Sequence, residues 1–552
     1  NTAFGAHHDY AVKAGIDLGY GPMSLSDEGW RGLLAPANVQ ASDGEYTDKI
    51  AVTWGLVNTA TGYRIYRSEI DDDPSPPFLA SVTGGTTTSY DDFSAVPNTQ
   101  YWYSVSAWIT VQLNEGLRST DDVGTIGNKS PVADLSADPT EGDAPLTVNF
   151  DASASYDDDG SIVKYEWDWT NDGSYDHDSG TDPTVSHEYT DAGEYTCKLR
   201  VTDDDGATDT DSVLVKAYMW FTWTVDDEMS EINSIKSTVI LDDLGMPHIA
   251  YLRWYSGELT LFYATFDEGW QVEPVAVACE WYPQVMQNQS GELMILYNDH
   301  HDYVSVAKKA DTDWSIDSAA PGFSFNQFSA AIDSAGGIHA VLHDKDDDDD
   351  LEYGHYASGE WSFETIDSAN YVGEGCSIVV DMGNHPCVSY QYRNTGDLRY
   401  AHKVSDWSIQ DVDDGFGYGE LPSSIIVDSA GNPCIVYTRD LGGSGDKVRM
   451  ARYSGGSWTR EVIYDNACIE SPRALCVDSE GNLHVVFHYL GTHKLVYAFC
   501  DGAEFEYTNL EGGGGVGNAS ITVDSYNKPA ITYRTGSGYN CKLRFAYYCT
   551  GM

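Results

Sequence analysis

The fold of this chain is decided by the stretch Ser424-Ile-Ile-Val-Asp-Ser-Ala-Gly-Asn-Pro-Cys-Ile-Val-Tyr437. Apolar residues on both sides of Asp-x-x-Gly-Asn are typical of two antiparallel strands joined by a tight turn. The same element recurs along the C-terminal part of the chain. Close copies run from Ser377 to Tyr390 and from Ser520 to Tyr533, and looser copies surround Asp242, Asn288, Asp333 and Asp478.

A second repeated element is an aromatic residue followed five positions later by an apolar one. It occurs at Trp270, Trp314, Trp361, Trp407, Trp458 and Phe505. Successive copies are 44 to 51 residues apart, which is the period of a four-stranded propeller blade. A seventh copy, Trp220 with Val225, precedes all the turn elements. We therefore expect residues 217–552 to form a seven-bladed β-propeller in which strand 220–226 completes the last blade and removes its open edge.

The composition agrees with a modular, all-β chain of several domains. At 552 residues the chain exceeds what one hydrophobic core supports. We expect an N-terminal extension at 1–34, two β-sandwich modules at 35–128 and 129–216, and the propeller at 217–552. The net charge of −57 disfavours nucleic acid and anionic membranes as partners, and no apolar run is long enough for membrane insertion.

The first sandwich resembles a fibronectin type III module. The resemblance is carried by Asp48-Lys-Ile-Ala-Val-Thr-Trp54, Gly62-Tyr-Arg-Ile-Tyr66 and Pro97-Asn-Thr-Gln-Tyr-Trp-Tyr-Ser-Val-Ser-Ala107. It implies that Trp54 is the core tryptophan and that Tyr101 or Tyr103 is the corner tyrosine. Such modules are usually spacers, so the resemblance predicts the fold but no specific function.

The second sandwich resembles a PKD domain. The matching stretches are Pro145-Leu-Thr-Val-Asn-Phe-Asp151, Tyr165-Glu-Trp-Asp-Trp169 and Gly193-Glu-Tyr-Thr-Cys-Lys-Leu-Arg-Val-Thr-Asp203. The resemblance implies an extracellular or cell-surface protein, because these domains typically hold other domains away from a cell wall. Cys197 is alone in this module and is expected to be a core thiol.

An Asp-rich loop in the PKD-like module is the candidate calcium site. Asp168, Thr170, Asp172 and Asp176 place oxygens at alternating positions around Gly173, as a calcium loop does. A terminal bidentate glutamate is missing, and Asp-Gly pairs also form ordinary turns. The sequence favours solvated turns, with Ca²⁺ as the alternative cofactor, and predicts no organic cofactor.

The extension contains a candidate edge or donor strand at 11–21. Its apolar positions alternate with polar or glycine positions, which is the period of a half-buried strand. The alternating residues are Val12, Ala14, Ile16, Leu18 and Tyr20. The strand is expected to pair with its own neighbouring module or, as the alternative, with another copy of this chain.

Alignment of the blades gathers charged residues at one propeller face, around the channel mouth. This candidate ligand-binding set is Arg253, Glu280, Trp281, Glu374, Arg393, Glu420, Arg439, Glu470, His488 and Arg534. Converging arginines suit a carboxylate or sulfate, and a glutamate beside them suits acid–base chemistry. The simpler interpretation, which we favour, is that arginines and glutamates of adjacent blades pair with each other.

The repeat is similar to the sialidase or BNR-type propeller superfamily across 217–552. The Asp box that this superfamily carries on the turn between its third and fourth strands is missing, for example at Gly455-Gly-Ser-Trp458. The resemblance therefore transfers no catalytic residue. His248, His339 and His484 share a blade position with Cys387 and Cys434, but different blades lie too far apart to hold one ion, so a structural role is expected. Cys500 and Cys549 are candidates for a disulfide.

These patterns favour a non-catalytic extracellular binding or adhesion protein. Its propeller face, presented by the sandwich spacers, is expected to recognise a glycan or another cell-surface polymer. One alternative is a structural subunit of an extracellular filament or surface layer, assembled through the N-terminal strand. The other is a glycosidase or lyase that acts on an anionic sugar.

Overall fold

The protein is all-β, as expected from the sequence. The computed structural model describes residues 7–10, 13–16, 19–23, 27–30, 33–109, 114–229, 236–277, 283–299, 303–310, 313–319, 321, 325–344, 350–369, 371–414, 422–439, 445–512, 515–536 and 541–551. These residues contain strands and turns but no α-helix. The chain divides into two compact units, Asn1–Ala217 and Tyr218–Met552.

The N-terminal extension forms two short antiparallel pairs. Strand β1 (His7–Tyr10) pairs with β4 (Asp27–Trp30), and β2 (Lys13–Ile16) pairs with β3 (Gly19–Met23). The segment 11–21, expected as one strand, is thus divided between β2 and β3. These two strands pair with each other, so each has one edge satisfied within the extension.

The first sandwich consists of two antiparallel sheets. The smaller sheet contains β5 (Gln40–Ala41), β6 (Ile50–Thr53) and β9 (Ser89–Asp92). The larger sheet contains β7 (Gly62–Ser68), β8 (Phe78–Thr83), β10 (Tyr101–Ile109), β11 (Asn114–Arg118) and β12 (Asp122–Gly124). Alternating apolar residues of both sheets fill the core, where Trp54 contacts Tyr63 with ring centroids 5.3 Å apart.

The second sandwich is built in the same way. One sheet contains β13 (Ser136–Asp138), β15 (Leu146–Asp151) and β18 (Thr184–Tyr189). The facing strands are β14 (Glu141–Asp143), β16 (Ile162–Asp168), β17 (His177–Gly180), β19 (Gly193–Asp203) and the first half of β20 (Thr208–Met229). Trp167 and Cys197 are fully buried between them, which places Cys197 in the core as a free thiol.

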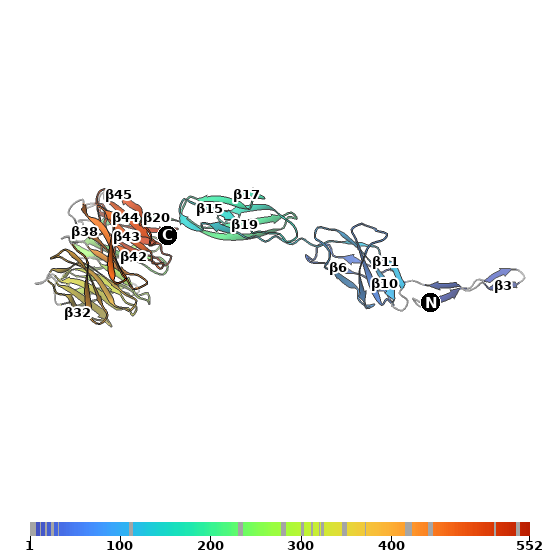
Figure 1. Ribbon diagram of the computed structural model, residues 1–552, viewed down its shortest axis with the longest axis horizontal. Coiled ribbons are helices and arrows are strands. Elements are labelled where there is room, and N and C mark those ends of the chain that lie inside the picture. Colours follow the sequence, from blue (N-terminus) through green and yellow to red (C-terminus); the bar gives the residue numbers. More distant parts are fainter. Residues whose placement is uncertain are drawn as a thin grey trace. The chain divides into compact units, whose positions relative to one another are not determined.

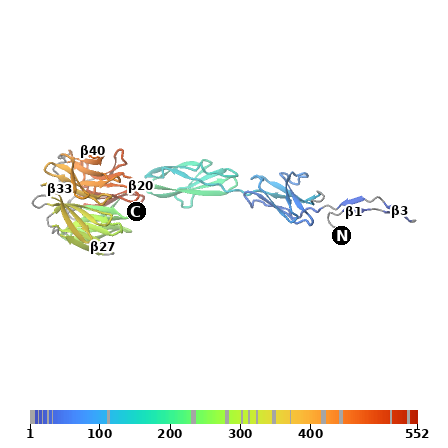
Figure 2. The same cartoon turned by 60° about the horizontal axis from the view of Figure 1, so that its bottom comes forward.

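The second unit is a seven-bladed propeller, numbered here by blade in chain order. The inner strands are β21 (Ser237–Leu241), β25 (Gln284–Gln287), β29 (Phe325–Ile332), β33 (Val372–Val380), β37 (Ser423–Val427), β41 and β42 (Ala467–Cys468, Leu475–Val477) and β46 (Gly517–Val523). The second strands are β22 (Pro247–Tyr255), β26 (Leu293–Asn298), β30 (Ile338–Asp344), β34 (Pro386–Tyr392), β38 (Pro433–Arg439), β43 (Leu483–Tyr489) and β47 (Pro529–Thr535). In Figure 2, β27, β33 and β40 follow the chain around this unit.

Each blade is completed by a third and an outer strand. The third strands are β23 (Glu258–Phe266), β27 (Val304–Ala310), β31 (Leu351–Ala357), β35 (Asp397–Lys403), β39 (Lys447–Ser454), β44 (Lys494–Cys500) and β48 (Cys541–Cys549). The outer strands are β24 (Trp270–Val277), β28 (Asp313–Ala319), β32 (Glu360–Asp367), β36 (Trp407–Asp413), β40 (Ser457–Asp465), β45 (Glu506–Gly512) and the second half of β20. Blade 6 can be followed in Figure 1 from β42 through β43 and β44 to β45.

The ring closes as the repeat count predicts. The second half of β20 pairs antiparallel with β48, from Met219 opposite Cys549 to Met229 opposite Cys541. The first and last portions of this unit therefore share blade 7. Closure pairs the free edge of β48, which would otherwise expose unsatisfied backbone groups.

The Asp-x-x-Gly-Asn turns have one structure in all seven blades. The side-chain oxygen of the first residue accepts backbone N–H groups two and four positions later, as Asp428 does from Ala430 at 2.9 Å and from Asn432 at 2.7 Å. The fourth turn residue has a positive φ, 83° at Gly431 and 62° at Asn384, where glycine and asparagine are favoured. The repeated Asp or Asn thus satisfies the backbone of each hairpin.

The aromatic repeat joins neighbouring blades. In several blades the ring that begins the outer strand packs edge-on against a tyrosine on the third strand of the preceding blade. The pairs are Tyr263 with Trp314, Tyr353 with Trp407, Tyr400 with Trp458, and Tyr497 with Trp220, at centroid distances of 5.1 to 5.5 Å. Edge-to-face pairs of this kind add to the stabilisation that comes from apolar burial.

The disulfide considered between two of the cysteines is not formed. Cys500 and Cys549, considered as a disulfide pair, are both free thiols. Each is buried within its own blade.

The described part of the chain contains no helix with the length and hydropathy that a membrane span requires.

Candidate functional sites on the propeller

A cavity of about 320 Å³ lies where blades 3 and 4 meet. Blade 3 contributes His339, Tyr353, His355, Ser362, Phe363 and Glu364, and blade 4 contributes Asn384, His385, Pro386, Lys403 and Val404. The walls combine aromatic rings with charged and hydrogen-bonding groups. A cavity of this kind can take a small polar ligand, because its volume is at the lower end of the range, about 300–1,000 Å³, usual for ligand pockets.

The cavity lies at the opposite strand ends from the face predicted by the sequence. Pro386, which lines it, begins β34, whereas the predicted Arg393 follows the end of the same strand. Lys403 likewise ends β35, beside the turn that leads to the outer strand. These residues lie beside turns at the other face of the propeller, apart from the loops that hold the predicted set.

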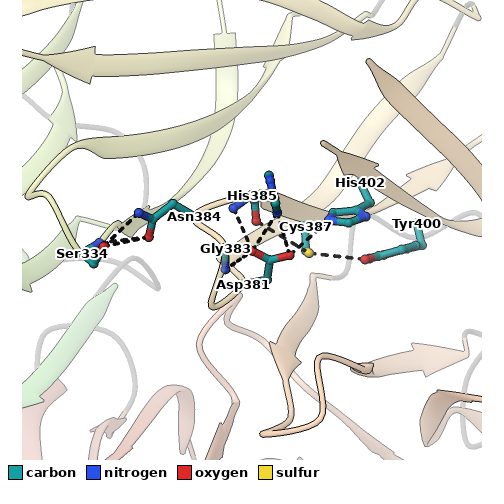
Figure 3. A network of polar contacts seen from close by, with 8 residues as sticks. All are labelled: Ser334, Asp381, Gly383, Asn384, His385, Cys387, Tyr400 and His402. Carbon is teal, nitrogen blue, oxygen red and sulfur yellow. Dashed lines mark hydrogen bonds and ion pairs between the residues drawn. The ribbon is translucent and has the colours of Figure 1, made fainter. Parts of the chain in front are cut away.

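A polar network at the blade 4 turn forms one side of this region (Figure 3). Asp381 accepts the backbone N–H of His385 at 2.8 Å, and its second oxygen contacts His385 Nδ1 at 3.2 Å and His402 Nε2 at 3.3 Å. The Tyr400 hydroxyl donates to Cys387 Sγ at 3.3 Å. Although burial opposes ionisation, hydrogen bonds from the backbone of His385 and Gly383 and from the His385 side chain hold the pKa of Asp381 below its ordinary value.

The same turn is tied to blade 3. The amide group of Asn384 exchanges hydrogen bonds with Ser334 in the equivalent turn, at 2.8 and 3.1 Å (Figure 3). Asn527 and Ser479 make the same link between blades 7 and 6. At these two junctions the turns therefore support one another as well as satisfying their own backbone.

Two of the four predicted arginines are engaged by carboxylates. Arg253 is buried and donates to Asp226 at 2.7 Å, and Arg393 donates to Glu374 at 2.7 Å. Arg253 thus pairs with an aspartate of the adjacent blade 7, whereas Arg393 pairs with a glutamate of its own blade 4 rather than of an adjacent one. Arg439 makes no ion pair within the described part of the chain.

Among the other residues of the candidate ligand-binding set, Glu470 interacts with His488 and Arg534. It accepts the Asn518 amide at 2.7 Å and contacts His488 Nδ1 at 3.2 Å. Burial opposes its ionisation, but His488, the Asn518 amide and the charge of Arg534 leave the pKa of Glu470 below its ordinary value. Three predicted residues are thus brought together, while Glu280, Trp281 and Glu420 lie outside the described residues.

The channel also contains an arginine that the alignment did not identify. The inner strand of blade 6 is interrupted between β41 and β42, and the intervening Arg473 reaches across the ring. Its Nε donates to Gln284 Oε1 of blade 2 at 2.8 Å, and its Nη2 donates to the Ala330 carbonyl of blade 3 at 2.7 Å. The adjacent Pro472 carbonyl accepts the hydroxyls of Ser377 and Ser424, each at 3.1 Å. This segment therefore joins blade 6 to four other blades.

The candidate calcium loop is held by its own backbone. Asp168 is buried and accepts N–H groups from Thr170, Asp172 and Gly173 at 2.9 to 3.3 Å. Asp176 accepts the Trp169 amide at 3.0 Å. The turn interpretation accounts for these contacts, and calcium binding here stays a prediction.

The residues of the candidate assembly strand carry no described side-chain contacts. Ala14, Ile16 and Tyr20 lie in β2 and β3, of which only the backbone pairing is described, and Val12 and Leu18 lie outside the described residues. Self-assembly through this strand stays a prediction.

Comparison with known proteins identifies one segment of the chain as similar to a domain family. Residues 128–217 match the model of the PKD domain, which agrees with the resemblance of the second sandwich. A collagenase, ColA of Clostridium perfringens, is 33% identical over 101 residues, which cover 18% of this chain and 9% of that relative. The chain thus spans less than a tenth of this curated relative.

Two solved structures illustrate the range of similarity. The PKD1 domain of Vibrio anguillarum Epp is 37% identical, with 16% of this chain and 95% of that chain covered and a TM-score of 0.14. The Aleuria aurantia lectin, solved with Fucα1-6GlcNAc, is 13% identical, with 51% of this chain and 96% of that chain covered and a TM-score of 0.38.

Proposed function

We propose that this chain is a non-catalytic extracellular binding protein that recognises a glycan through its propeller. The observation that carries the proposal is the cavity between blades 3 and 4. Sugars present hydroxyl groups at the edges of their rings and C–H groups on their faces. The cavity offers matching groups, because Phe363 supplies an aromatic surface and Glu364, His385 and Lys403 supply hydrogen-bonding groups, of which Glu364 and Lys403 already pair with each other.

The extracellular part of the proposal is supported by the PKD match at residues 128–217. The two sandwiches would serve as spacers that present the propeller, and the first of them carries the fibronectin type III pattern. A surface with a net charge of −57 also favours uncharged or cationic ligands over polyanions.

A catalytic role on an anionic sugar has less support. Such a role would use the arginines of the channel face, yet Arg253 and Arg393 are bound to Asp226 and Glu374. Opening either pair to receive a substrate would separate charges that already satisfy each other. We therefore place the ligand in the cavity rather than at the channel mouth.

A glycan array with the full chain tests the proposal, followed by calorimetry with the best ligand. Lys403→Ala and Phe363→Ala should each weaken binding at least tenfold, since each removes a group that lines the cavity. Arg393→Ala is the matched control, because it changes the opposite strand end, and it should leave affinity unchanged.

Two outcomes would overturn the proposal. One is the absence of binding to any glycan. The other is a loss of binding in Arg393→Ala or Arg439→Ala with full binding in Lys403→Ala and Phe363→Ala, which would place the site at the channel face.

A further inference from the structure

Three side chains of blade 3 bring metal-ligand atoms together. Asp333 lies in the turn before β30, His339 lies on β30 and His355 lies directly opposite it on β31. One carboxylate oxygen and one nitrogen from each imidazole lie within 4.8 Å of one another. Two imidazoles and a carboxylate are a usual protein ligand set for zinc.

The distances suit a tetrahedral ion. His339 Nε2 lies 3.2 Å from Asp333 Oδ2. Two ligands about 2.1 Å from a tetrahedral zinc are separated by roughly 3.4 Å, so this pair already has nearly the required spacing. A small approach of His355 would complete the set. The fourth position would face the cavity, because His339 and His355 both line it.

The third ligand has an unused nitrogen. His355 Nε2 is buried and has no hydrogen-bond partner in the described part of the chain. A buried, unsatisfied polar atom is costly in a folded protein and calls for an explanation, of which a bound ion is one. A metal at this point would satisfy His355 directly.

The surrounding groups already hold the ligands in place. Asp333 Oδ1 accepts the amides of Ala335 and Gly337 at 2.8 and 2.7 Å, which fixes the carboxylate and leaves Oδ2 toward the histidines. His339 Nδ1 lies 2.5 Å from the Tyr353 hydroxyl. Such contacts on the far side of a ligand are typical of metal centres, because they fix the orientation of each imidazole and carboxylate.

Gly337 distinguishes this turn from the others. At the same turn position, Asn432 of blade 5 and Asn482 of blade 6 donate to the free oxygen of their own aspartate, at 3.2 and 2.9 Å. A Cβ at Gly337 would lie 2.8 Å from Asp333 Oδ2 and 3.0 Å from His355 Nε2. A side chain at this position would therefore crowd both groups, and glycine lets the aspartate and the histidine approach each other here.

The other blades provide internal comparisons. Blade 6 repeats the Asp–His–Tyr arrangement with Asp478, His484 and Tyr497, but Phe499 stands opposite His484 where blade 3 has His355. Blade 4 has His402 at that place, yet its middle ligand is Cys387, and burial raises the pKa of this thiol to about 12. Blade 4 therefore differs from blade 3 in offering a thiol in place of an imidazole, which a thiolate charge-transfer band would reveal.

We infer that Asp333, His339 and His355 bind a divalent cation of the zinc class at the wall of the cavity. The inference is independent of the proposed glycan ligand, because it rests on the ligand set alone. The chelator-treated full chain should bind Zn²⁺ in calorimetry and, with Co²⁺ as the probe, show the visible absorption of a tetrahedral site without a thiolate charge-transfer band.

Two variants and one matched control test the assignment. His355→Asn removes a ligand, and Gly337→Asn fills the space with the residue that blades 5 and 6 use, so each should weaken Zn²⁺ binding at least tenfold. His484→Asn changes the equivalent histidine of blade 6 and should leave Zn²⁺ affinity unchanged. Far-ultraviolet circular dichroism and thermal melting without metal establish that each variant folds.

The inference is overturned by several results. Absence of Zn²⁺ binding to the intact chain would overturn it, as would unchanged affinity in both His355→Asn and Gly337→Asn. A thiolate charge-transfer band that disappears in Cys387→Ser would place the metal in blade 4 instead. None of these measurements uses a glycan, so a failed glycan screen leaves the metal result unaffected.

Discussion

The hydroxyl of Tyr390 donates a hydrogen bond of 2.8 Å to Asp367, and this bond joins two neighbouring blades of the propeller. Asp367 ends the outer strand of blade 3, whereas Tyr390 lies on the second strand of blade 4. The same carboxylate accepts Arg399 of blade 4 at 2.9 Å. Tyr437 with Asp413, Tyr251 with Asp226, and Tyr533 with Glu511 repeat this contact at three other blade junctions.

Tyr390→Phe should destabilise the propeller by about 1–3 kcal/mol, because it leaves the buried Asp367 with one hydrogen bond fewer and little access to water. Tyr437→Phe should have a similar effect through Asp413. Urea denaturation of the full chain measures both changes. The control is Tyr371→Phe, whose side chain is 50% exposed and which should change the free energy of unfolding by less than about 0.5 kcal/mol. Equal effects in Tyr390→Phe and Tyr371→Phe would contradict the importance of this contact.

Arg473→Met should weaken the connection between blade 6 and blades 2 and 3. The substitution removes two charge-assisted hydrogen bonds while keeping the apolar stem, and we expect a loss of about 1.5–3 kcal/mol. Burial lowers the pKa of Arg473 to about 10, so the guanidinium stays charged at neutral pH and remains a donor to both partners. Hydrogen exchange should show faster opening near Gln284 and Ala330 than in the sandwich modules. Unchanged exchange there would indicate that the crossing does not support the ring.

The buried His484 should make the propeller less stable in mild acid. Burial lowers its pKa below the ordinary value, against the opposing influence of Asp478, so the unfolded chain binds a proton more tightly at this residue than the folded chain does. The free energy of unfolding should therefore fall as the pH decreases below about 6.5, by at most about 1.4 kcal/mol per pH unit for this group. In His484→Gln the fall between about pH 6.5 and 5 should be smaller, which denaturant titrations can measure. An unchanged slope would show that other groups cause the acid sensitivity.

Phe499→His should create a second metal site in blade 6. The substitution places an imidazole opposite His484, next to Asp478, in the arrangement that blade 3 has with His355, His339 and Asp333. Combined with Asn482→Gly, which empties the space that Gly337 leaves in blade 3, it should add one equivalent of bound Zn²⁺ in calorimetry. Asn482→Gly alone should add none, because the third ligand is then absent. No added binding in the double variant would count against the ligand geometry assigned to blade 3.

Much of the architecture could be predicted from the sequence because it follows from repetition. Each copy of Ser-Ile-Val-Val-Asp-x-x-Gly-Asn carries its own turn chemistry, and the acceptance of two amides by Asp428 is a local interaction that any copy can make. The copy of the aromatic repeat at Trp220 precedes all the turn elements. Because a ring of blades has no free end, this first strand was expected to complete the last blade. Pairing of arginines with glutamates was expected between adjacent blades, whereas Arg393 pairs with Glu374 of its own blade.

The cavity and the ligand set could not be predicted in this way. The sequence shows that His339 occupies the same blade position as His248 and His484, but these histidines lie on different blades. The second imidazole of the ligand set is His355, which lies on the next strand of the same blade. Loop length determines which residue of the third strand stands opposite a given residue of the second, and the loop between β30 and β31 differs in length from its counterparts. A register count across each hairpin is the signal that would have identified His355.

The sequence by itself determined that the chain is all-β, that it contains a seven-blade ring and that strand 220–226 closes this ring. These properties depend on periodic apolar patterns and on turn residues that act within a few positions of one another. Only the tertiary structure decided that Arg473 crosses the channel, that Tyr390 binds Asp367 of another blade, and that Asp333, His339 and His355 converge. Those contacts depend on the twist and register of neighbouring strands, which result from the packing of the whole ring.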